Sequence, residues 1–444
     1  STNLNVKLQA TTEKALSQAV MRAKSLGYHA DGGAAVVMDV HSGKILALAS
    51  YPTYDLNIFQ KGLTQAQAKD LFGESTGVPA LIRPLQGMYA PASTFKSISI
   101  VAASKAGYNL NAKYDCPASV QVGNREFKNF ETSPLGMITM QNAIAVSCDT
   151  VWYKIAYDQW IKDGGLSPKS SANDYFFNAA RSFNIGKKTG IDLPGEASGR
   201  LPDRQWKLDY YKQNKDFYCN FTQKAKKSDL TPYLIAIAKE NCTDGYIIRA
   251  GDAVNFSIGQ GDTLLTPLQM TVVYAAVANG GTLWKPYVAR AIVDSKGKVI
   301  KEFAPEIVGK TEQTPSDTEF LHKALRSVAT SGTAAGVFAG FPVQVAGKTG
   351  TGQDLGRNKN GSAKDDTSWF ASFAPADSPQ YAVVMVVSQG GFGASVSAPG
   401  VKDIYTTLFG VVGGKIDPTK SAFPNGIPNT LPKLDVKNAK LVTK

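Results

Sequence analysis

The chain has 444 residues, of which 43% are hydrophobic and 19% are charged, and its formal net charge is +12. These values are typical of a globular protein with one large or two ordinary domains. No apolar run approaches the ~18 residues that a membrane span needs, and the first residues lack the features of a signal peptide, so we expect a trimmed piece of a longer protein. The charge favours anionic surroundings (nucleic acid, a membrane face or a wall polymer) or serves solubility alone.

Near the N-terminus, residues 12–27 carry apolar side chains at helical spacing, which predicts an amphipathic helix. A strand at Ala34–Asp39, a tight turn at 41–43 and a second strand at Ile45–Ala49 follow. Two strands joined by a tight turn are typical of a β-hairpin, which places the N-terminal part of the chain in a sheet.

Further strand-like runs occur near the other end, at Val343–Thr349, Thr367–Ala374 and Tyr381–Ser388, and a helix-like stretch follows at Ala398–Val412. One sheet assembled from both ends of the chain and covered by the helical material between them is the economical arrangement. We therefore predict an α/β fold of the α+β kind, with an antiparallel five-stranded sheet flanked by helices.

Along the chain we expect a helical lead-in at residues 1–30 and a main domain at 31–412. Within it, 205–250 is a polar insert rich in lysine and tyrosine, with poor periodicity, which we interpret as a solvated excursion. Residues 413–444 repeat Pro, Lys and Asn, and we expect an irregular tail.

Four cysteines and three histidines are spread over the sequence, and no Cys-x-x-Cys motif is present. A zinc site made of cysteine and histidine is therefore disfavoured. We favour a disulfide between Cys219 and Cys242, because both lie in the polar insert, with Cys116 and Cys148 as the second pair. Free buried thiols are the alternative.

The segment VAGKTGTG, at Val345–Gly352, allows two unrelated interpretations. Gly-Lys-Thr ends the phosphate-binding P-loop, G-x-x-x-x-G-K-[ST], of nucleotide hydrolases. The first glycine of that motif would fall at Pro342, and the glycines and asparagines after Thr351 would break the helix that a P-loop must open. A strand followed by a loop fits better, so the P-loop is disfavoured.

A second interpretation begins at Ser93 and Lys96, three residues apart at the start of a helix-compatible run that Pro91 introduces. Serine is a poor nucleophile until a neighbouring base takes its proton. Lysine can be that base if burial and nearby positive charge, which Lys348 could supply, lower its pKa. The helix N-terminus also places the Ser93 N–H near a developing oxyanion.

Ser147-Cys-Asp149 follows in a helix-like stretch, Ala143–Tyr157. It supplies a second hydroxyl and, two residues on, a polar partner. Tyr153 and Tyr157 in the same stretch are more readily explained as core or supporting residues than as catalytic ones.

The third motif is Lys348-Thr349-Gly350, just before two strands. Lysine there could bind a carboxylate, Thr349 and Thr351 offer hydroxyls, and Gly350 would let a substrate lie against the strand edge. Trp369 could line the same cleft, but core packing is favoured. Three motifs in this order, each in a fitting context, favour a serine acyl transferase.

The three motifs together are the signature of penicillin-binding proteins and class A β-lactamases. From about residue 30 to 412, the chain resembles the transpeptidase domain of a class B penicillin-binding protein. The resemblance includes the segments ILALASYPTYDLN, LQGMYAPASTFKS, GIDLPGEASGRLP, SIGQGD, TPLQ and LWKP. The last of these most resemble the elongation-type enzymes that act in cell-shape maintenance rather than division.

The resemblance implies a peptidoglycan D,D-transpeptidase that works through an acyl-enzyme and that β-lactams inhibit covalently. Ser93 would be the nucleophile and Lys96 the general base, while Ser147 would shuttle a proton and Asp149 would bond within the site. The enzyme would attack the D-Ala-D-Ala bond of a stem peptide, release D-alanine and pass the acyl group to an amine on a neighbouring strand.

The resemblance also implies the substrate-binding residues, which are Lys348, Thr349, Gly350 and Thr351. Lys348 and Thr349 would hold the substrate's carboxylate, and the backbone amides of Ser93 and Thr351 would form the oxyanion hole. A zinc site known in some relatives would need a cluster of cysteine, histidine and aspartate that this sequence does not assemble, so we expect neither metal nor cofactor.

Two positions depart from the family pattern. The second motif usually ends in Asn, where this chain has Asp149, and an ionised Asp cannot donate a hydrogen bond. The residue before the nucleophile is usually Gly, where this chain has Ala92, so we expect φ below zero in the approach turn.

By the same resemblance, a transmembrane helix and a pedestal domain would precede residue 1 and hold the domain at the outer face of the bacterial cytoplasmic membrane. Partners would be peptidoglycan stem peptides, β-lactam antibiotics, a membrane glycosyltransferase of the SEDS type and other elongation-complex proteins, but not nucleic acid. The alternatives are a β-lactamase, for which no deacylating base is identified, a non-catalytic β-lactam sensor domain and, remotely, a P-loop nucleotide hydrolase.

Overall fold

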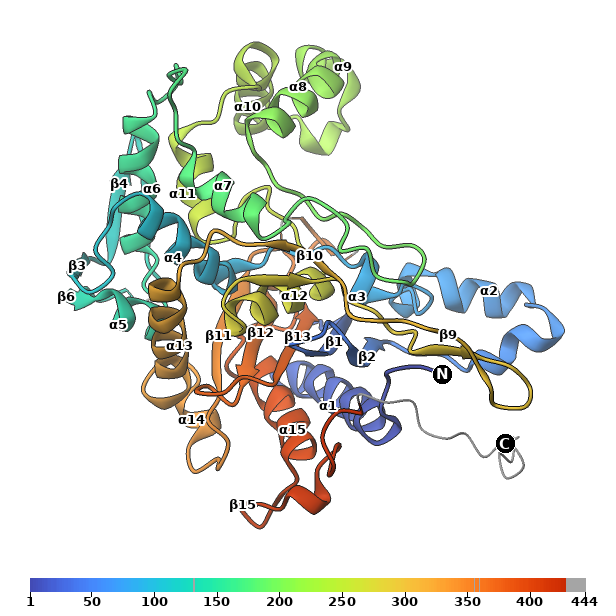
Figure 1. Ribbon diagram of the computed structural model, residues 1–444. Helices are drawn as coiled ribbons and strands as arrows, with labels where there is room; N and C mark the ends of the chain where they lie inside the picture. The colour runs from blue at the N-terminus through green and yellow to red at the C-terminus, as the bar shows by residue number, and fades with distance from the viewer. Residues whose placement is uncertain (131, 355, 359, 429–444) are drawn as a thin grey trace.

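The computed structural model of the chain describes residues 1–130, 132–354, 356–358 and 360–428. At its centre lies an antiparallel five-stranded sheet with the order β11-β12-β13-β1-β2 (Figure 1). In that order the strands are Ala346–Gly352, Thr367–Ala374, Tyr381–Ser388, Gly32–Asp39 and Ile45–Tyr51. The prediction of one antiparallel sheet built from both ends of the chain is confirmed.

The central strands are continuous apolar runs because both faces of the sheet are covered. Every residue of β1, β12 and β13 is buried. Helices α1 (Val6–Ser25) and α15 (Ser397–Phe409) pack against each other and against the sheet, and α12 (Pro267–Ala278), buried along its whole length, contacts β1, β12 and β13. Helix α13 (Pro315–Thr330) packs beside the edge strand β11.

The other helices and the small sheets lie between the halves of the central sheet along the chain, except for β14 and β15, which follow α15. The helices are α2 (Gln65–Phe72), α3 (Arg83–Gln86), α4 (Lys96–Lys105), α5 (Met140–Ala145), α6 (Thr150–Lys162), α7 (Tyr175–Ser182), α8 (Arg204–Cys219), α9 (Phe221–Lys224), α10 (Pro232–Asp244), α11 (Ala250–Ser257) and α14 (Ala335–Phe338). The small paired strands are β3 (Lys113–Cys116) with β6 (Gly136–Thr139), β4 (Ser119–Val122) with β5 (Arg125–Lys128), β7 (Thr282–Trp284) with β10 (Ile307–Lys310), β8 (Ala291–Val293) with β9 (Val299–Glu302), and β14 (Val411–Val412) with β15 (Lys415–Ile416).

Helix α1 begins at Val6, earlier than the predicted start at residue 12, and ends at Ser25. Its start is set by Asn5, whose side chain accepts a hydrogen bond from the Leu8 N–H at 2.9 Å and so caps the helix. The apolar spacing alone does not reveal this first turn, because Leu8 is its only buried residue.

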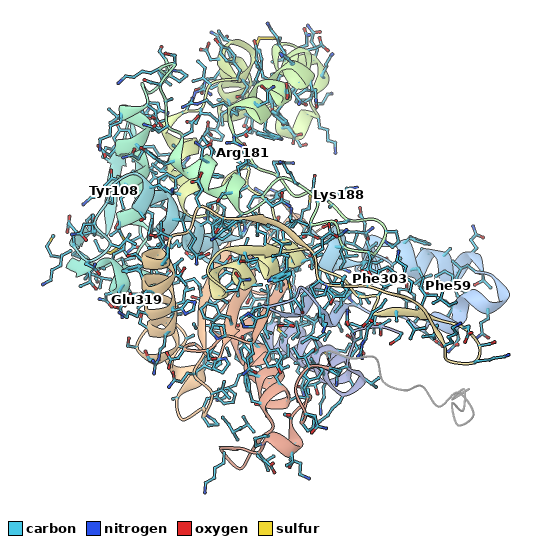
Figure 2. The ribbon with its side chains drawn as sticks, viewed as in Figure 1. Phe59, Tyr108, Arg181, Lys188, Phe303 and Glu319 are labelled. Carbon is cyan, nitrogen blue, oxygen red and sulfur yellow. A yellow bond between two sulfur atoms is a disulfide. The ribbon has the colours of Figure 1, made fainter. Side chains whose placement is uncertain are left out.

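The insert at 205–250 is helical, which its poor periodicity did not indicate. Helices α8, α9 and α10 project from the body of the molecule (Figure 1), and their side chains stand apart from it (Figure 2). No residue of α8 is buried, and Ala238 is the buried residue of α10, so these helices have little apolar stripe to detect. The disulfide between Cys219 and Cys242 joins them where a core would otherwise be needed.

Helix α15 ends at Phe409 rather than at the predicted residue 412, because Gly410 takes a left-handed conformation with φ of 66° and terminates it. The expected irregular tail starts with the short hairpin of β14 and β15 and a 3-10 turn at Pro418–Lys420. The rest of that prediction, residues 429–444, lies outside the described residues.

Candidate active site

The first motif lies where a 3-10 turn, Ala92–Phe95, runs directly into α4. Ser93 is in the turn and Lys96 is the first residue of the helix. Ala92 has φ of 49°, so the expectation of a negative φ in the approach turn is wrong. Its N–H donates to the Gly259 carbonyl at 2.9 Å, and this tertiary contact holds a left-handed conformation that costs an L-residue about 1–2 kcal/mol.

Ser93 and Lys96 are connected through the second motif. Ser147 Oγ donates to Ser93 Oγ at 3.0 Å, and Lys96 Nζ donates to Ser147 Oγ at 3.3 Å. Lys96 Nζ also donates to the Ser147 carbonyl at 3.0 Å and to Asp149 Oδ1 at 2.6 Å. The four residues predicted to be catalytic therefore form one connected chain of polar contacts, ordered Ser93, Ser147, Lys96 and Asp149.

The second motif lies in a break between two helices, so the prediction of one continuous helical stretch over Ala143–Tyr157 is wrong. Helix α5 ends at Ala145 and α6 begins at Thr150, and Ser147 between them has φ of 60°. Residues two apart in a helix do not face the same direction. The break therefore allows Ser147 and Asp149 to reach Lys96 together.

The third motif occupies the edge strand β11. Lys348 is fully buried, and its Nζ donates to the Thr349 carbonyl at 3.2 Å. Thr349 Oγ1 is 2.7 Å from the hydroxyl of Thr333. A methyl group on Gly350 would lie about 3 Å from the segment that carries Ser93, so glycine permits this close approach.

Burial lowers the pKa of both lysines of the site, and the neighbouring carboxylate opposes this effect. Burial lowers the pKa of Lys96, although Asp149 beside it raises the pKa and opposes that effect. Burial also lowers the pKa of Lys348 well below the ordinary value for lysine, the charge of Lys96 lowers it further, and Asp149 raises it. Two buried amines thus share one carboxylate, which makes a neutral lysine accessible in this site.

The family model of the penicillin binding protein transpeptidase domain matches residues 33–406. The chain belongs to this family.

The transpeptidase domain is 29% identical over 385 residues to the peptidoglycan D,D-transpeptidase MrdA of Acinetobacter baumannii, a match that covers 82% of this chain and 49% of the relative. Its fold is similar to a chain solved in a study of how a peptidoglycan synthase complex coordinates polymerization and crosslinking (TM-score 0.73, 28% identity, 93% of this chain and 63% of that one). It is also similar to PBP2 of Pseudomonas aeruginosa in complex with WCK 5153 (TM-score 0.70, 25% identity, 94% and 80%). The chain spans about half the length of the curated relatives it matches.

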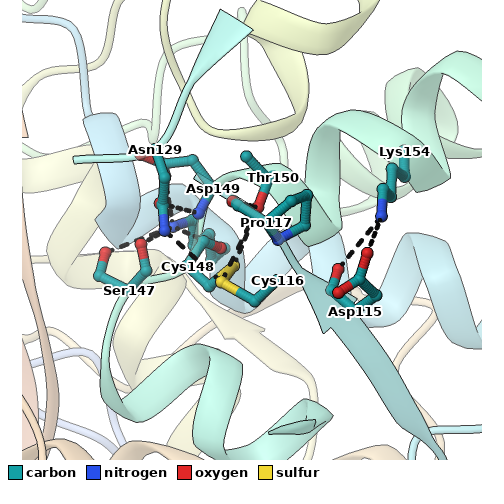
Figure 3. The surroundings of a disulfide bond; sticks show 10 residues. Asp115, Cys116, Pro117, Asn129, Ser147, Cys148, Asp149, Thr150 and Lys154 are labelled. Carbon is teal, nitrogen blue, oxygen red and sulfur yellow. Dashed lines mark hydrogen bonds and ion pairs between the residues drawn. A yellow bond between two sulfur atoms is a disulfide. The ribbon is translucent and has the colours of Figure 1, made fainter. Parts of the chain in front are cut away.

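In this transpeptidase domain, both predicted disulfides are present, and the alternative of free thiols is excluded. Cys148, the middle residue of the second motif, is bonded to Cys116 at the end of β3 (Figure 3). Asn129, which sequence reasoning missed, accepts a hydrogen bond from the Asp149 N–H at 2.8 Å and donates to Cys116 Sγ at 3.5 Å. Asn129 belongs to none of the three motifs, and it reaches the site only because the fold brings it beside Asp149.

Other supporting residues were also missed. Gln260 donates to the Thr351 carbonyl at 3.3 Å. It lies in the SIGQGD segment, whose sequence indicates a resemblance to the family but no contact with the site. The exposed rings of Phe130 and Phe392 pack edge to face with their centroids 5.3 Å apart. Phe130 follows Asn129, which bonds to the second motif, and Phe392 precedes Gly393, which lies against β11 and so against the third motif. The aromatic pair therefore connects the second motif with the third.

The aromatic residues assigned to the core are there. Trp369 is fully buried, and its indole N–H donates to the Ala90 carbonyl at 3.0 Å, behind the nucleophile turn. Tyr153 is buried with its ring centroid 5.6 Å from that of Phe127. Tyr157 stacks on Trp160 and is partly buried.

The structure also bears on a P-loop, a metal site and a membrane-spanning helix. Gly-Lys-Thr lies within strand β11, paired along its length with β12, so it does not open a helix as a P-loop does. Among the described residues, no group of three or more His, Cys, Asp or Glu side chains is arranged to hold a metal ion. Nor does any helix in the described part of the chain have the length and apolar character to cross a membrane.

Proposed function

We propose that this domain is a serine D,D-transpeptidase that cross-links peptidoglycan stem peptides during cell elongation and that β-lactams inhibit by forming a stable acyl-enzyme. One observation carries the proposal: a fully buried lysine, Lys96, lies 3.3 Å from Ser147 Oγ, which in turn lies 3.0 Å from Ser93 Oγ. A relative named peptidoglycan D,D-transpeptidase MrdA supports the choice of substrate.

The contacts support a relay for the first step. Neutral Lys96 takes the proton of Ser147 while Ser147 takes the proton of Ser93, and Ser93 Oγ attacks the carbonyl carbon of the D-Ala-D-Ala bond. In the structure Lys96 Nζ lies 3.3 Å from Ser147 Oγ, and Ser147 Oγ lies 3.0 Å from Ser93 Oγ, so one path of hydrogen bonds can carry the proton. The same path then returns that proton to the leaving amine, and D-alanine departs.

The third motif would bind the substrate during this step. Lys348 and Thr349 would hold the terminal carboxylate, and the backbone amides of Ser93 and Thr351 would face the oxyanion. Gly350 keeps β11 close to the nucleophile turn, which supports an extended substrate lying along the strand. In the second step, an amine of a neighbouring stem peptide gives its proton to the relay and attacks the acyl-enzyme, which forms the cross-link and frees Ser93.

We also propose that the domain works at the outer face of the cytoplasmic membrane as part of a longer, anchored protein. Two disulfides support an oxidising compartment. The similarity to a chain from a peptidoglycan synthase complex supports a polymerising partner. We propose a glycosyltransferase of the SEDS type in that place, beside other elongation-complex proteins.

Incubation with a fluorescent penicillin, followed by denaturing electrophoresis, tests the proposal. A stable covalent label is expected on the wild-type chain and not on Ser93→Ala, while Ser104→Ala, a partly exposed serine on α4, serves as the matched control and should label normally. Rapid turnover of the drug would indicate a β-lactamase. A stable label without transfer of a stem-peptide acyl group to an amine would indicate a sensor, and no label would overturn the proposal.

A further inference from the structure

The residue between Ser147 and Asp149 is half of a buried disulfide. Cys148 is bonded to Cys116, and both are fully buried. Both of its chain neighbours reach Lys96, through Ser147 Oγ at 3.3 Å and Asp149 Oδ1 at 2.6 Å, and the Cys148 carbonyl itself accepts from Lys96 Nζ at 3.3 Å. A bond that fixes Cys148 therefore limits how far either neighbour can move from the lysine.

Polar contacts strengthen the same connection (Figure 3). Asn129 accepts from the Asp149 N–H at 2.8 Å and donates to Cys116 Sγ at 3.5 Å. Thr150 Oγ1 donates to the Pro117 carbonyl at 2.9 Å. Cys116, Pro117 and Asn129 all belong to the segment from β3 to the residue that follows β5, so the second motif is tied to that segment as well as to its own helices.

The local sequence favours a different conformation from the one that the disulfide holds. Residues Ala143–Tyr157 have the pattern of a continuous helix, yet the structure breaks this helix between Ala145 and Thr150 and holds Ser147 at φ of 60°. A left-handed conformation costs a non-glycine residue about 1–2 kcal/mol. Closing the break into a helix would remove that cost and would turn Ser147 and Asp149 away from each other.

We infer that the disulfide between Cys116 and Cys148 is a positioning element of the acyl-transfer site, which holds the break between α5 and α6 so that Ser147 stays between Lys96 and Ser93. Both cysteines act through Ser147 and Asp149 and are positioning residues. The inference rests on the proposed function, because its effect is a change in the rate of acylation. A displacement of about 1 Å can cost on the order of 100-fold in rate, so we expect the dithiol form to acylate at least about tenfold more slowly.

The second disulfide offers a matched control, because Cys219 and Cys242 lie in the projecting insert. Cys219→Ala with Cys242→Ala leaves only the site disulfide, and this variant should acylate like the wild type. It is produced in a reducing compartment as the dithiol and then oxidised with glutathione disulfide. The two protein thiols form one disulfide while glutathione disulfide is reduced to two thiols, and thiol titration after denaturation verifies each state.

Acylation by a chromogenic cephalosporin is then measured in both states, separating the noncovalent binding constant from the rate constant of acylation. The expected result is a slower acylation rate constant in the dithiol form, similar binding, a retained melting transition, and recovery on oxidation. A chain that also carries Cys116→Ala and Cys148→Ala should match the dithiol form, and it keeps the test independent of reoxidation.

Equal acylation rates in the oxidised, dithiol and cysteine-free chains would overturn the inference. Loss of the melting transition in both unbridged forms would also overturn it, because the disulfide would then serve folding rather than positioning. Failure of the proposed function looks different, since the oxidised wild-type chain itself would then take no covalent label.

Discussion

The ion pair between Lys96 and Asp149 should set the pH range in which the site can acylate. Burial lowers the pKa of Lys96, and Asp149, at 2.6 Å, raises it. Asp149→Asn removes the negative charge and keeps an oxygen in place. A charge-assisted hydrogen bond contributes about 1.5–3 kcal/mol and a neutral one about 0.5–1.5 kcal/mol, so the substitution removes about 1 kcal/mol or slightly more of support for the ammonium.

The direction of the expected pH shift follows from the proposed role of Lys96 as the general base. Only the neutral amine can accept a proton, and the neutral fraction rises as pH rises through the pKa of Lys96. Lowering that pKa moves the acidic limb of the acylation rate profile to lower pH, by about one pH unit, because about 1.4 kcal/mol corresponds to one unit. On the limb, the variant should acylate about tenfold faster than the wild type at the same pH. On the plateau it should be somewhat slower, because a weaker base accepts the proton less readily.

Stopped-flow measurement of acylation by a chromogenic cephalosporin between acidic and alkaline pH gives both profiles. Asp115→Asn is the matched control, since Asp115 pairs with Lys154 at 2.8 Å and has a half-exposed side chain. It removes one carboxylate from the same region without touching Lys96. A limb that stays in place or moves to higher pH in Asp149→Asn would refute the reasoning, as would an equal displacement in Asp115→Asn.

Three further substitutions test other parts of the site. Ser147→Ala should slow acylation about 10²–10⁴-fold in rapid kinetics with little effect on the binding constant, because it interrupts the relay from Lys96 to Ser93; wild-type rates would exclude the relay. Lys348→Met should weaken binding of carboxylate-bearing β-lactams yet raise the free energy of unfolding in urea near neutral pH by about 1 kcal/mol or more. Because burial lowers the pKa of Lys348, the unfolded wild-type chain binds more protons than the folded one, so the wild type gains stability as pH rises toward the ordinary lysine pKa. The difference in unfolding free energy between Lys348→Met and the wild type should therefore narrow as pH rises. A difference that stays constant with pH would contradict this. Gly350→Ala should lower both acylation and stability, the latter by about 1–3 kcal/mol in the same urea assay, since its methyl group would press on the nucleophile turn.

The parts of the fold that the sequence predicts are those with a strong local signal. Thr367–Ala374 and Tyr381–Ser388 form strands with the predicted bounds, because long apolar runs between turns leave little choice. Ser93 and Lys96 lie in one continuous turn for a similar reason, although their side chains are connected only through Ser147. Each of these predictions depends on neighbours in the chain.

The parts that could not be predicted depend on contacts between distant segments. Ala92 has a positive φ because the Gly259 carbonyl, far along the chain, accepts its N–H. The helix break at Ser147 is held by Cys116 and Asn129; the sequence pairs Cys116 with Cys148, but neither Cys116 nor Asn129 indicates that the helix breaks. In each case a tertiary contact outweighs the local preference, and it does so at the site.

The order of strands in the central sheet also determines when the site can form during synthesis. Strand β1 lies between β2 and β13, and β11, which carries Lys348, reaches the sheet only through β12 and β13. One pairing, that of β1 with β13, joins segments from opposite ends of the chain, and such long-range pairing is slow. During synthesis Ser93 is therefore made long before Lys348, and the hairpin of β1 and β2 must wait for β13. We expect C-terminally truncated chains that lack β11 to β13 to form no penicillin adduct.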